Sequence, residues 1–421
     1  MRLIADLHIH SRFARAVSKD MNLPTLEAWG EKKGIGLIGT GDCTHPEWLR
    51  ELKAELEEDG SGFLKRKGSS SRIRFLLSVE ISCIYSKGGA TRRIHLIVCP
   101  PNFKTAETIN ARLSQIGNLK ADGRPILGAD VQEIVQIALD ASPECLIIPA
   151  HAWTPWFSLY GSRSGFDSIE ECFGTLTEHI QGIETGLSSD PAMNWRLPEL
   201  DTKTIVSFSD AHSPRNIGRE ATIFELDTPS FSSLRNAMHI PFPTAHEVDR
   251  IAMTVEFFPE EGKYHWDGHR LCKIRWAPEE TKKHKGLCSI CGKPVTVGVM
   301  NRVDELAKRP VDFTDDRRPS FKHMVPLAEI IGDALGVGKL TKTVAKEYDA
   351  LVGNAGSEFS VLLETPAGDL ERMTTPKIAE GIRRVREGQI TIHPGYDGEY
   401  GTVKIFSDNE PQLTEQSSLF S

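Results

Sequence analysis

Imidazole and carboxylate side chains recur at short, regular spacings through the first half of the sequence. His8 and His10 form a His-x-His pair, and Asp210 and His212 form an Asp-x-His pair. Residues i and i+2 of a strand point to the same side, so each pair can offer two ligands to one metal ion. Mixed nitrogen and carboxylate ligands suit Zn, Mn or Fe. The nine predicted ligands are His8, His10, Asp42, His45, Glu80, His95, His151, Asp210 and His212.

Nine candidates exceed what a single ion needs, so the set predicts a centre of two or three divalent ions. Such centres hydrolyse phosphate esters by activating water and stabilising the leaving oxygen. The ions that these ligands accept are Zn, Mn, Mg or Fe. We expect Glu80 to bridge two ions and Asp210 and His151 to act with it in catalysis.

Apolar segments lead into nearly all of these ligands. The residues at 3–5, 36–38, 75–77, 145–148 and 204–206 are apolar or β-branched and indicate buried parallel strands. In α/β barrels the chemistry lies at the C-terminal ends of such strands. The pattern therefore predicts an α/β fold with the metal centre at the mouth of a barrel.

A second metal site is indicated further along the chain. His269-x-x-Cys272 and Cys288-x-x-Cys291 have the spacing of two knuckles that share one tetrahedral Zn. His265 and His284 are alternatives for the histidine ligand. Because protein side chains would fill all four positions, we expect a structural zinc module.

Several basic and aromatic residues are candidates for contact with DNA. The loop after His151 is aromatic and predicts either a packed lid or a stacking surface for an unpaired base. Basic residues follow His10, and a basic run occurs near residue 384. The DNA-binding candidates are Arg12, Arg15, Lys19, Trp153, Trp156, Tyr160, Arg163, Arg383 and Arg384.

The ligand order resembles that of the PHP (polymerase and histidinol phosphatase) family. The chain has the opening His-x-His, a glutamate, two isolated histidines and the closing Asp-x-His. The second motif departs from the family's Thr-Asp-His, because Thr40-Gly41-Asp42 is followed only later by His45. The resemblance implies a distorted seven-stranded β/α barrel with up to three ions over about residues 1–245.

The combination of motifs resembles endonuclease Q enzymes more specifically. It joins the PHP half and the zinc module to a segment at 394–401 that reads Pro-Gly-Tyr-Asp-Gly-Glu-Tyr-Gly. The resemblance implies an endonuclease that nicks DNA on the 5′ side of deaminated bases (uracil, hypoxanthine, xanthine) and abasic sites. The expected parts are the PHP nuclease domain at 1–245, the zinc module at 246–300, a mainly helical DNA-binding domain at 301–406 and a tail at 407–421.

The C-terminal part shows helical spacing with glycine breaks. It indicates helices at 327–336, 342–351, 358–363 and 376–387. A plain supporting domain and a DNA clamp remain alternatives for this region. The tail ends with Gln416, Leu419 and Phe420, which resemble the short peptide that docks into the bacterial sliding clamp.

Composition and charge bear on the cellular location and the binding partners of the protein. The 421 residues carry 50 basic and 58 acidic side chains, a net charge of −8 that argues weakly against nucleic acid, although basic residues occur in clusters. Eight cysteines in a chain of this length do not indicate a disulfide scaffold. The sequence has no secretory leader and no apolar stretch near 20 residues, so we expect a cytoplasmic protein without a membrane partner.

Three other functions compete with lesion-specific cleavage. A PHP phosphatase acting on a small phosphomonoester such as histidinol phosphate needs neither the zinc module nor the helical part. A non-catalytic DNA-damage binder usually lacks some of the metal ligands that are present here. A 3′–5′ exonuclease requires a free DNA end, which a closed circular substrate does not offer.

Overall fold

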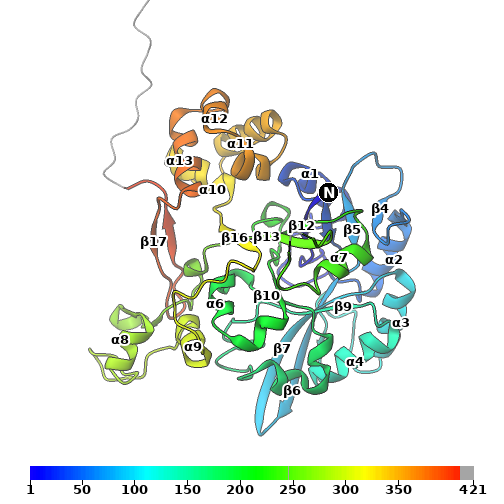
Figure 1. Ribbon diagram of the computed structural model, residues 1–421, viewed down its shortest axis with the longest axis horizontal. Helices are drawn as coiled ribbons and strands as arrows, with labels where there is room; N and C mark the ends of the chain where they lie inside the picture. The colour runs from blue at the N-terminus through cyan, green and yellow to red at the C-terminus, as the bar shows by residue number, and fades with distance from the viewer. Residues whose placement is uncertain (245, 408–421) are drawn as a thin grey trace, which may run out of the picture.

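The computed structural model describes residues 1–244 and 246–407. Beside a large α/β body lies a small region that contains α8 (Pro278–Lys283) and α9 (Val299–Leu306), and a separate helical bundle lies apart from this region (Figure 1). No helix among the described residues is long and apolar enough to cross a bilayer. The mixed α/β fold agrees with the predicted fold class.

The main sheet is mixed and has the order β16-β13-β12-β1-β2-β5-β4-β3. Its centre is parallel, since β2 pairs with both β1 and β5 in parallel register. Antiparallel strands extend it on both sides, beginning with β12 beside β1. The strands are β1 (Arg2–Asp6), β2 (Leu37–Gly39), β3 (Leu56–Glu58), β4 (Leu64–Arg66), β5 (Arg74–Leu76), β12 (Ala221–Glu225), β13 (Arg250–Glu256) and β16 (Ser320–His323).

Two further sheets complete the α/β body. One has the order β8-β6-β7-β9, and the other is the parallel pair β10-β11. A single parallel bridge between Ile9 and Ala211 connects the segments that follow β1 and β11. The strands are β6 (Val79–Lys87), β7 (Ala90–Cys99), β8 (Ile126–Leu127), β9 (Leu146–Pro149), β10 (Gly182–Glu184) and β11 (Thr204–Val206).

The strands of the α/β body therefore form three separate sheets among the described residues, and the seven-stranded barrel stays a prediction. Backbone geometry at the site gives a physical reason for the gaps. Asp42, His151 and Asp210 have φ values of 49°, 30° and 47°, respectively, which a β ladder cannot contain. The chain leaves strand geometry at these three predicted ligands, whereas Glu80 and His95 lie within β6 and β7.

Helices cover the outer faces of these sheets (Figure 1). α1 shows why they form where they do: the Asn22 side chain accepts a hydrogen bond from the Thr25 N–H, Pro24 lies in the first turn, and Gly34 ends the helix at φ 86°. The helices of the α/β body are α1 (Leu23–Lys33), α2 (Pro46–Glu55), α3 (Phe103–Leu113), α4 (Val131–Ala141), α5 (Ile169–Phe173), α6 (Pro191–Trp195) and α7 (Phe231–Ala237).

The helical bundle largely follows the sequence prediction. The helix expected at 342–351 continues through Gly353 to Ala355, because a single helical glycine costs only about 1 kcal/mol. The segment expected at 358–363 contains a π-helical turn, Ser360–Glu364, and one short helix was not anticipated. The bundle contains α10 (Leu327–Leu335), α11 (Lys342–Ala355), α12 (Ala367–Met373) and α13 (Pro376–Arg386).

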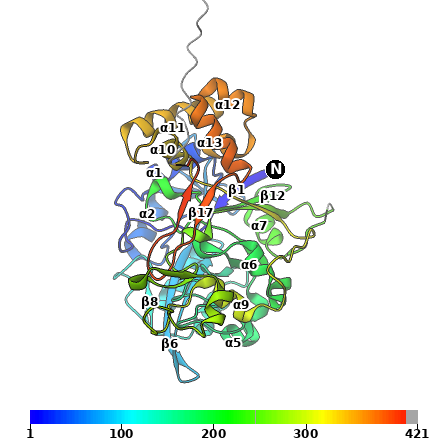
Figure 2. The ribbon, with the colours of Figure 1, turned by 90° about the vertical axis from the view of Figure 1, so that its left-hand side faces the viewer.

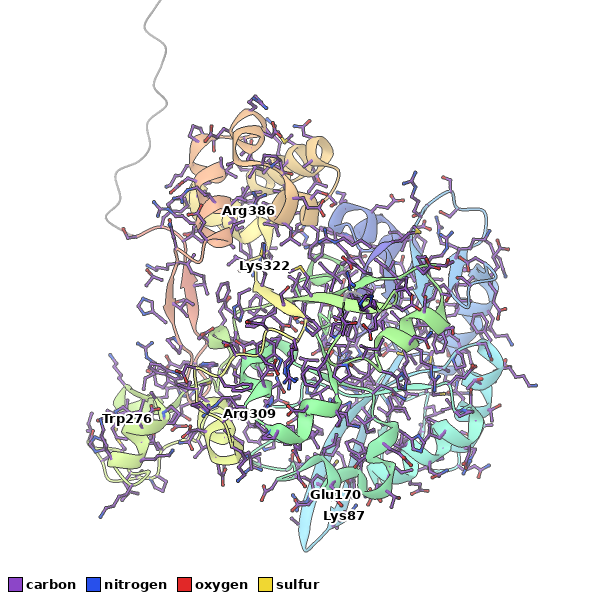
Figure 3. The ribbon with its side chains drawn as sticks, viewed as in Figure 1. Lys87, Glu170, Trp276, Arg309, Lys322 and Arg386 are labelled. Atoms are coloured by element: carbon purple, nitrogen blue, oxygen red, sulfur yellow. The ribbon has the colours of Figure 1, made fainter. Side chains whose placement is uncertain are left out.

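Ion pairs connect the later regions to the α/β body. Arg309, labelled in Figure 3, donates to the Trp195 carbonyl and to Asp201, both at 2.8 Å. Strand β17, which pairs with β18 in antiparallel register, extends from the bundle toward the region of α8 and α9 (Figure 1), and Figure 2 shows it below the bundle helices. The remaining strands are β14 (Asp267–His269), β15 (Ile274–Trp276), β17 (Thr391–His393) and β18 (Thr402–Lys404).

Candidate metal centre

Four predicted ligands from three strand ends meet in one group. His8 and His10 follow β1, Glu80 lies in β6, and Asp210 follows β11. His10 Nε2 lies 3.0 Å from Asp210 Oδ1 and 3.3 Å from Glu80 Oε2. His8 Nε2 lies 3.7 Å from an oxygen of each of the same two carboxylates. Two ligands each about 2.1 Å from one ion lie roughly 3.0 to 3.7 Å apart, so the spacing suits a shared ion.

A second group uses the other side of Glu80. His151 Nε2 lies 2.9 Å from Glu80 Oε1 and 3.2 Å from His95 Nδ1, and His95 also contacts this oxygen. Glu80 therefore belongs to both groups: Oε1 faces His151 and also lies 3.7 Å from His8 Nε2, whereas Oε2 faces His10. This is the arrangement expected of a carboxylate that bridges two ions.

The chemistry of this donor set fits metal binding. The Nε2 atom of His8 is buried and has no hydrogen-bond partner among the described residues. A buried nitrogen of this kind costs free energy unless it receives a proton or a cation. Because it points at two carboxylates 3.7 Å away, a divalent ion between them would satisfy all three groups.

The charges around Glu80 and His8 favour the binding of a cation between them. Burial disfavours the charged Glu80 carboxylate, but His95 and His8 outweigh it and hold the pKa of Glu80 well below its usual range. Burial also disfavours protonated His8, yet Glu184 and Glu80 raise the pKa of His8 well above its usual value. The carboxylates thus stay ionised and attract cations.

A layer of hydrogen bonds orients the metal-facing rings. His8 Nδ1 donates to Glu184 at 2.9 Å, and the His151 backbone N–H donates to the same carboxylate at 2.7 Å. Glu184 is fully buried at the end of β10. The sequence prediction missed it, although Glu184 ends an apolar strand in the same way that Glu80 follows one.

Three predicted ligands lie outside both groups. Asp42 accepts from His10 Nδ1 at 3.1 Å and from the Ser11 N–H at 2.6 Å, so it orients a ligand. His45 caps α2 and stacks on Phe13, with ring centroids 4.5 Å apart. The His212 ring lies 4.7 Å from the His10 ring, and its Nδ1 atom lies 3.5 Å from Asp210 Oδ1.

The backbone at the centre is strained. Asp42, His151 and Asp210 adopt positive φ, which non-glycine residues rarely do. A Cβ atom on Gly186 would lie 2.4 Å from His151 Cβ, so only glycine fits beside this histidine. Such strain persists where surrounding structure holds it, and it clusters at functional sites.

The predicted zinc knuckles also come together. Ligand atoms of His269, Cys272, Cys288 and Cys291 lie within 4.8 Å of one another, and His269 Nδ1 lies 3.4 Å from Cys291 Sγ. Of the alternative histidines, His284 stacks on Trp276 with centroids 4.4 Å apart, and His265 is buried. Neither belongs to the group in the described residues.

One family model and two proteins of known sequence are similar to this chain over different lengths. The family model of the MJ0043 C-terminal domain matches residues 326–389. The uncharacterized protein MJ0043 of Methanocaldococcus jannaschii is 34% identical over 272 residues, which are 63% of this chain and only 32% of that protein. The uncharacterized protein YqxK of Bacillus subtilis is 31% identical over an alignment of 424 positions, which covers 96% of this chain and 99% of that protein.

Two solved structures match over almost their whole length. The lesion-specific endonuclease PfuEndoQ from Pyrococcus furiosus has a TM-score of 0.84 and 29% identity, with 96% of this chain and 95% of that chain covered. Endonuclease Q in complex with a 27-mer duplex carrying an abasic lesion at its active site has a TM-score of 0.83, 30% identity and 97% coverage of both chains. The chain belongs to the endonuclease Q family.

In this endonuclease Q family member, the side chain of Arg124 contacts the metal groups, and the sequence did not predict it as a site residue. Arg124 Nη1 lies 3.2 Å from Glu80 Oε2, and the side chain is about one quarter exposed. Guanidinium groups bind phosphate oxygens in a fixed, forked geometry. No motif marks Arg124 in the sequence, because its role depends on how the loop before β8 folds back toward Glu80.

The aromatic loop of this endonuclease Q chain divides into two parts. Trp153 and Tyr160 are buried and donate to Asn194 and Glu199, so the prediction that they contact DNA is corrected to a packing role. Trp156 is 38% exposed and packs edge-on against Tyr264, and Arg163 is exposed. Only these two members of the predicted set from this loop present a surface to a ligand.

The remaining basic candidates differ in how far their charges are compensated. Arg12 pairs with Glu51 at 2.8 Å, and Arg15 pairs with Asp122 at 3.4 Å. Lys19 is exposed. Arg383 and Arg384 both bind Glu380 on their own helix, at 2.7 and 2.8 Å, which favours a structural role for them.

Proposed function

We propose that the chain is a DNA repair endonuclease that hydrolyses the phosphodiester on the 5′ side of deaminated bases (uracil, hypoxanthine, xanthine) and abasic sites. The observation that carries this proposal is the match, over 97% of both chains, to an endonuclease Q bound to an abasic duplex. The paired metal-ligand groups supply the chemistry that such a cut needs.

Each of the two groups of ligands would bind one metal ion. His8, His10, Glu80 and Asp210 would hold one ion, and Glu80, His95 and His151 a second. When bound, these divalent ions would supply Lewis acidity toward the phosphate and toward water. Glu80 holds the two groups at a fixed separation, and Glu184 and Asp42 keep the rings of His8 and His10 in place.

Arg124 would bind the scissile phosphate beside the metal groups. Its guanidinium lies 3.2 Å from Glu80 and is partly exposed, so a phosphate oxygen can approach it. Positioning the phosphate there aligns the phosphodiester with the ligands of both groups. Hydrolysis on the 5′ side of the lesion leaves a 3′-hydroxyl and a 5′-phosphate.

The outer regions would hold DNA and a replication partner. Zinc at His269, Cys272, Cys288 and Cys291 would stabilise the module beside the α/β body. The helical bundle would contact DNA phosphates. Binding of the bacterial sliding clamp by Gln416, Leu419 and Phe420 remains a prediction, since these residues lie outside the described part of the chain.

A closed circular DNA with a single deoxyuridine tests the proposal. We expect one nick on the 5′ side of the uracil with added Mg, Mn or Zn, and none in an undamaged circle of the same sequence. Equal cutting of both circles would contradict lesion specificity. Phosphate release from histidinol phosphate without any nick would instead indicate a PHP phosphatase.

A further inference from the structure

The backbone at Asp210 is held by side chains that lie outside both metal groups. Asp210 belongs to the first group, and its φ of 47° lies in the left-handed region that few non-glycine residues adopt. Strand β11 ends at Val206, and a single bridge between Ile9 and Ala211 is the ladder contact that follows it. The conformation of Asp210, and with it the direction of its carboxylate, therefore depends on side chains that bind the surrounding backbone.

The half-buried Arg219 binds the carbonyl on each side of the Asp210 Cα atom. Its Nε atom donates to the Ser209 carbonyl at 2.9 Å, and its Nη2 atom donates to the Asp210 carbonyl at 3.3 Å. These carbonyls belong to the two planar peptide units that meet at Asp210, and a guanidinium is a rigid, planar fork. One side chain thus fixes the orientation of both planes, and with it φ and ψ of Asp210. Because φ and ψ set the direction of the Cβ atom, Arg219 determines where the carboxylate points.

Asp6 binds the same segment through a backbone N–H. It ends β1 and is fully buried. Its Oδ1 atom accepts from the Ser209 N–H at 3.0 Å, and its Oδ2 atom accepts from the Gly218 N–H at 2.9 Å. The carboxylate therefore joins the Ser209 peptide to the turn that carries Arg219. Asp6 also lies two residues before His8, so this connection reaches the strand end that supplies the histidines of the first group.

We propose that Arg219 and Asp6 are positioning residues for the Asp210 carboxylate. Neither belongs to a metal group of the described residues, and each binds the backbone of Ser209 or Asp210. The result of this positioning is the distance of 3.0 Å between Asp210 Oδ1 and His10 Nε2, which suits a shared ion. Without Arg219, the Asp210 backbone would relax toward the negative φ values that L-residues favour, and the carboxylate would leave this place.

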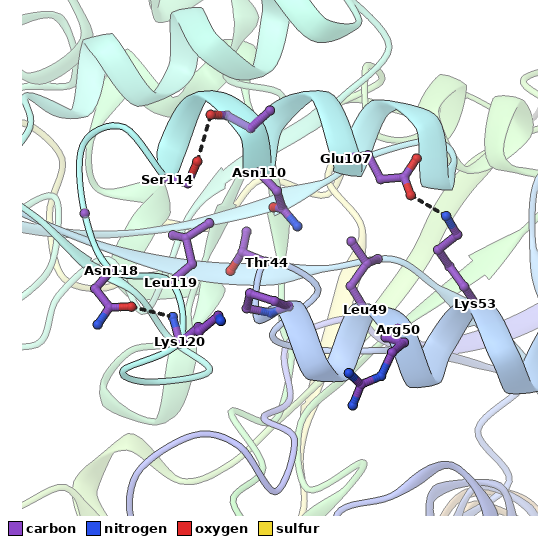
Figure 4. Close-up of a pocket in the computed structure, with 13 residues that line it drawn as sticks. Thr44, Leu49, Arg50, Lys53, Glu107, Asn110, Ser114, Asn118, Leu119 and Lys120 are labelled. Carbon is purple, nitrogen blue, oxygen red and sulfur yellow. Dashed lines mark hydrogen bonds and ion pairs between the residues drawn. The ribbon is translucent and has the colours of Figure 1, made fainter.

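Four arginine substitutions separate positioning from charge. Arg219→Gln removes the fork, whereas Arg219→Lys keeps the charge but offers one compact ammonium in place of N–H groups in a fixed plane. Arg215→Gln removes an exposed charge from the turn Pro214–Asn216, just before Arg219. Arg50→Gln removes an exposed charge from α2, at the rim of the groove between α2 and α3 (Figure 4).

Equilibrium dialysis of the full-length protein against manganese, with bound metal measured by elemental analysis, tests the proposal. We expect Arg219→Gln to raise the manganese concentration for half-occupancy of the catalytic groups at least about 10-fold, because loss of an orienting partner weakens a metal site roughly 10- to 100-fold. Arg219→Lys should fall between Arg219→Gln and the wild type, and both Arg215→Gln and Arg50→Gln should match the wild type. Asp6→Asn, which loses one of two acceptor oxygens, should also weaken binding. Zinc retained in the Cys/His module of each variant shows that the chain is folded.

A kinetic readout rests on the proposed endonuclease activity, whereas the metal readout does not. Added manganese should restore the kcat of Arg219→Gln on an abasic duplex, with the KM for the duplex equal to that of the wild type. Weakened manganese binding in Arg219→Gln, in a protein that does not nick damaged DNA, would contradict the proposed function and support the inference. Manganese affinity equal to the wild type in Arg219→Gln, or equal losses in Arg219→Gln and Arg215→Gln, would overturn the inference. A wild type that binds no ion besides zinc would overturn both.

Discussion

At the scale of single residues, the candidate metal centre depends on Glu184, a carboxylate that belongs to neither group of metal ligands. The Glu184 carboxylate accepts a hydrogen bond from His8 Nδ1 and another from the His151 backbone N–H. One side chain therefore orients a ligand in each metal group. Loss of such an orienting partner typically lowers metal affinity 10- to 100-fold.

Glu184→Gln should therefore raise the metal concentration needed for half-maximal nicking about 10-fold or more, with activity recovered at excess metal. Glutamine keeps the size of the side chain but removes the charge that favours the metal-binding tautomer of His8. Metal titration of the nicking rate measures this, with Glu31→Gln as an exposed control on α1. An unchanged metal requirement would show that Glu184 does not support the centre.

The predicted ligands that lie in the two metal groups include a spaced pair, His8 and His10, and isolated residues such as Glu80. His8/His10 and Asp210/His212 are visible because strand periodicity places each pair on one side. Arg124 and Glu184 were missed because only the folded chain brings them to Glu80 and His8. Trp153 was misjudged because burial, which decides its role, is not encoded by residue type.

At the scale of elements, the zinc module should depend on its ion independently of the α/β body. Cys288→Ser should remove one zinc per chain and increase hydrogen exchange in β14, β15 and α8, because protein ligands are the module's main cross-link. The ions of the catalytic groups should remain. Elemental analysis with exchange mass spectrometry measures both, and Cys99→Ala, in β7, is the control. Zinc content equal to the wild type would contradict the assigned ligands.

Two buried carboxyls, Glu220 just before β12 and Glu256 at the end of β13, make the stability of the fold depend on pH. Burial raises the pKa of Glu256 to about 7, and burial together with Glu256 raises that of Glu220 well above its usual value. These carboxyls are protonated in the folded protein while the unfolded chain ionises near pH 4.3. Their contribution is therefore complete below about pH 4.3 and is lost as pH rises toward 7.

Urea unfolding at pH 5 and pH 8 should show this loss in the wild type and reduce it in Glu256→Gln, whose side chain does not ionise. Between pH 5 and pH 8, the unfolding free energy of the wild type should fall by about 1 kcal/mol more than that of Glu256→Gln, or by a larger margin. The same pH dependence in both proteins would exclude Glu256 as its source.

At the scale of the whole molecule, one buried ion pair connects the helical bundle to the α/β body. Lys33 of α1 lies 2.7 Å from Glu358, which also accepts from the Tyr348 hydroxyl and the Leu327 N–H. Lys33 and Glu358 are each 3% exposed. Removing one partner of a buried pair leaves the other charge uncompensated and typically costs about 3 to 5 kcal/mol.

Lys33→Met should therefore destabilise the bundle interface by about 3 kcal/mol and increase hydrogen exchange in α10 and α11. Lys32→Met is a matched control, because Lys32 pairs with Asp349 of the same bundle in an exposed position and should change stability by less than about 1 kcal/mol. Equal effects of the two substitutions would contradict the role assigned to the buried pair.

Most helices of the C-terminal part were predictable from the sequence, and their contacts with the α/β body were not. Helical spacing and glycine positions indicated most of α10 to α13. Nothing local to Lys33 shows that it meets Glu358, which lies 325 positions later, since contacts of this range depend on the complete fold. The division of the strands into separate sheets was likewise not predicted from the sequence.

The central claim is that Glu80 joins two metal groups that together make the cut. Elemental analysis and the nicking rate on an abasic duplex, measured on the same preparation of Glu80→Gln, test it most directly. We predict that the variant keeps the zinc of the Cys/His module, loses the ions of the catalytic groups, and nicks at least about 1,000-fold more slowly than the wild type. A variant that retains its full metal content and nicks at the wild-type rate would contradict the claim.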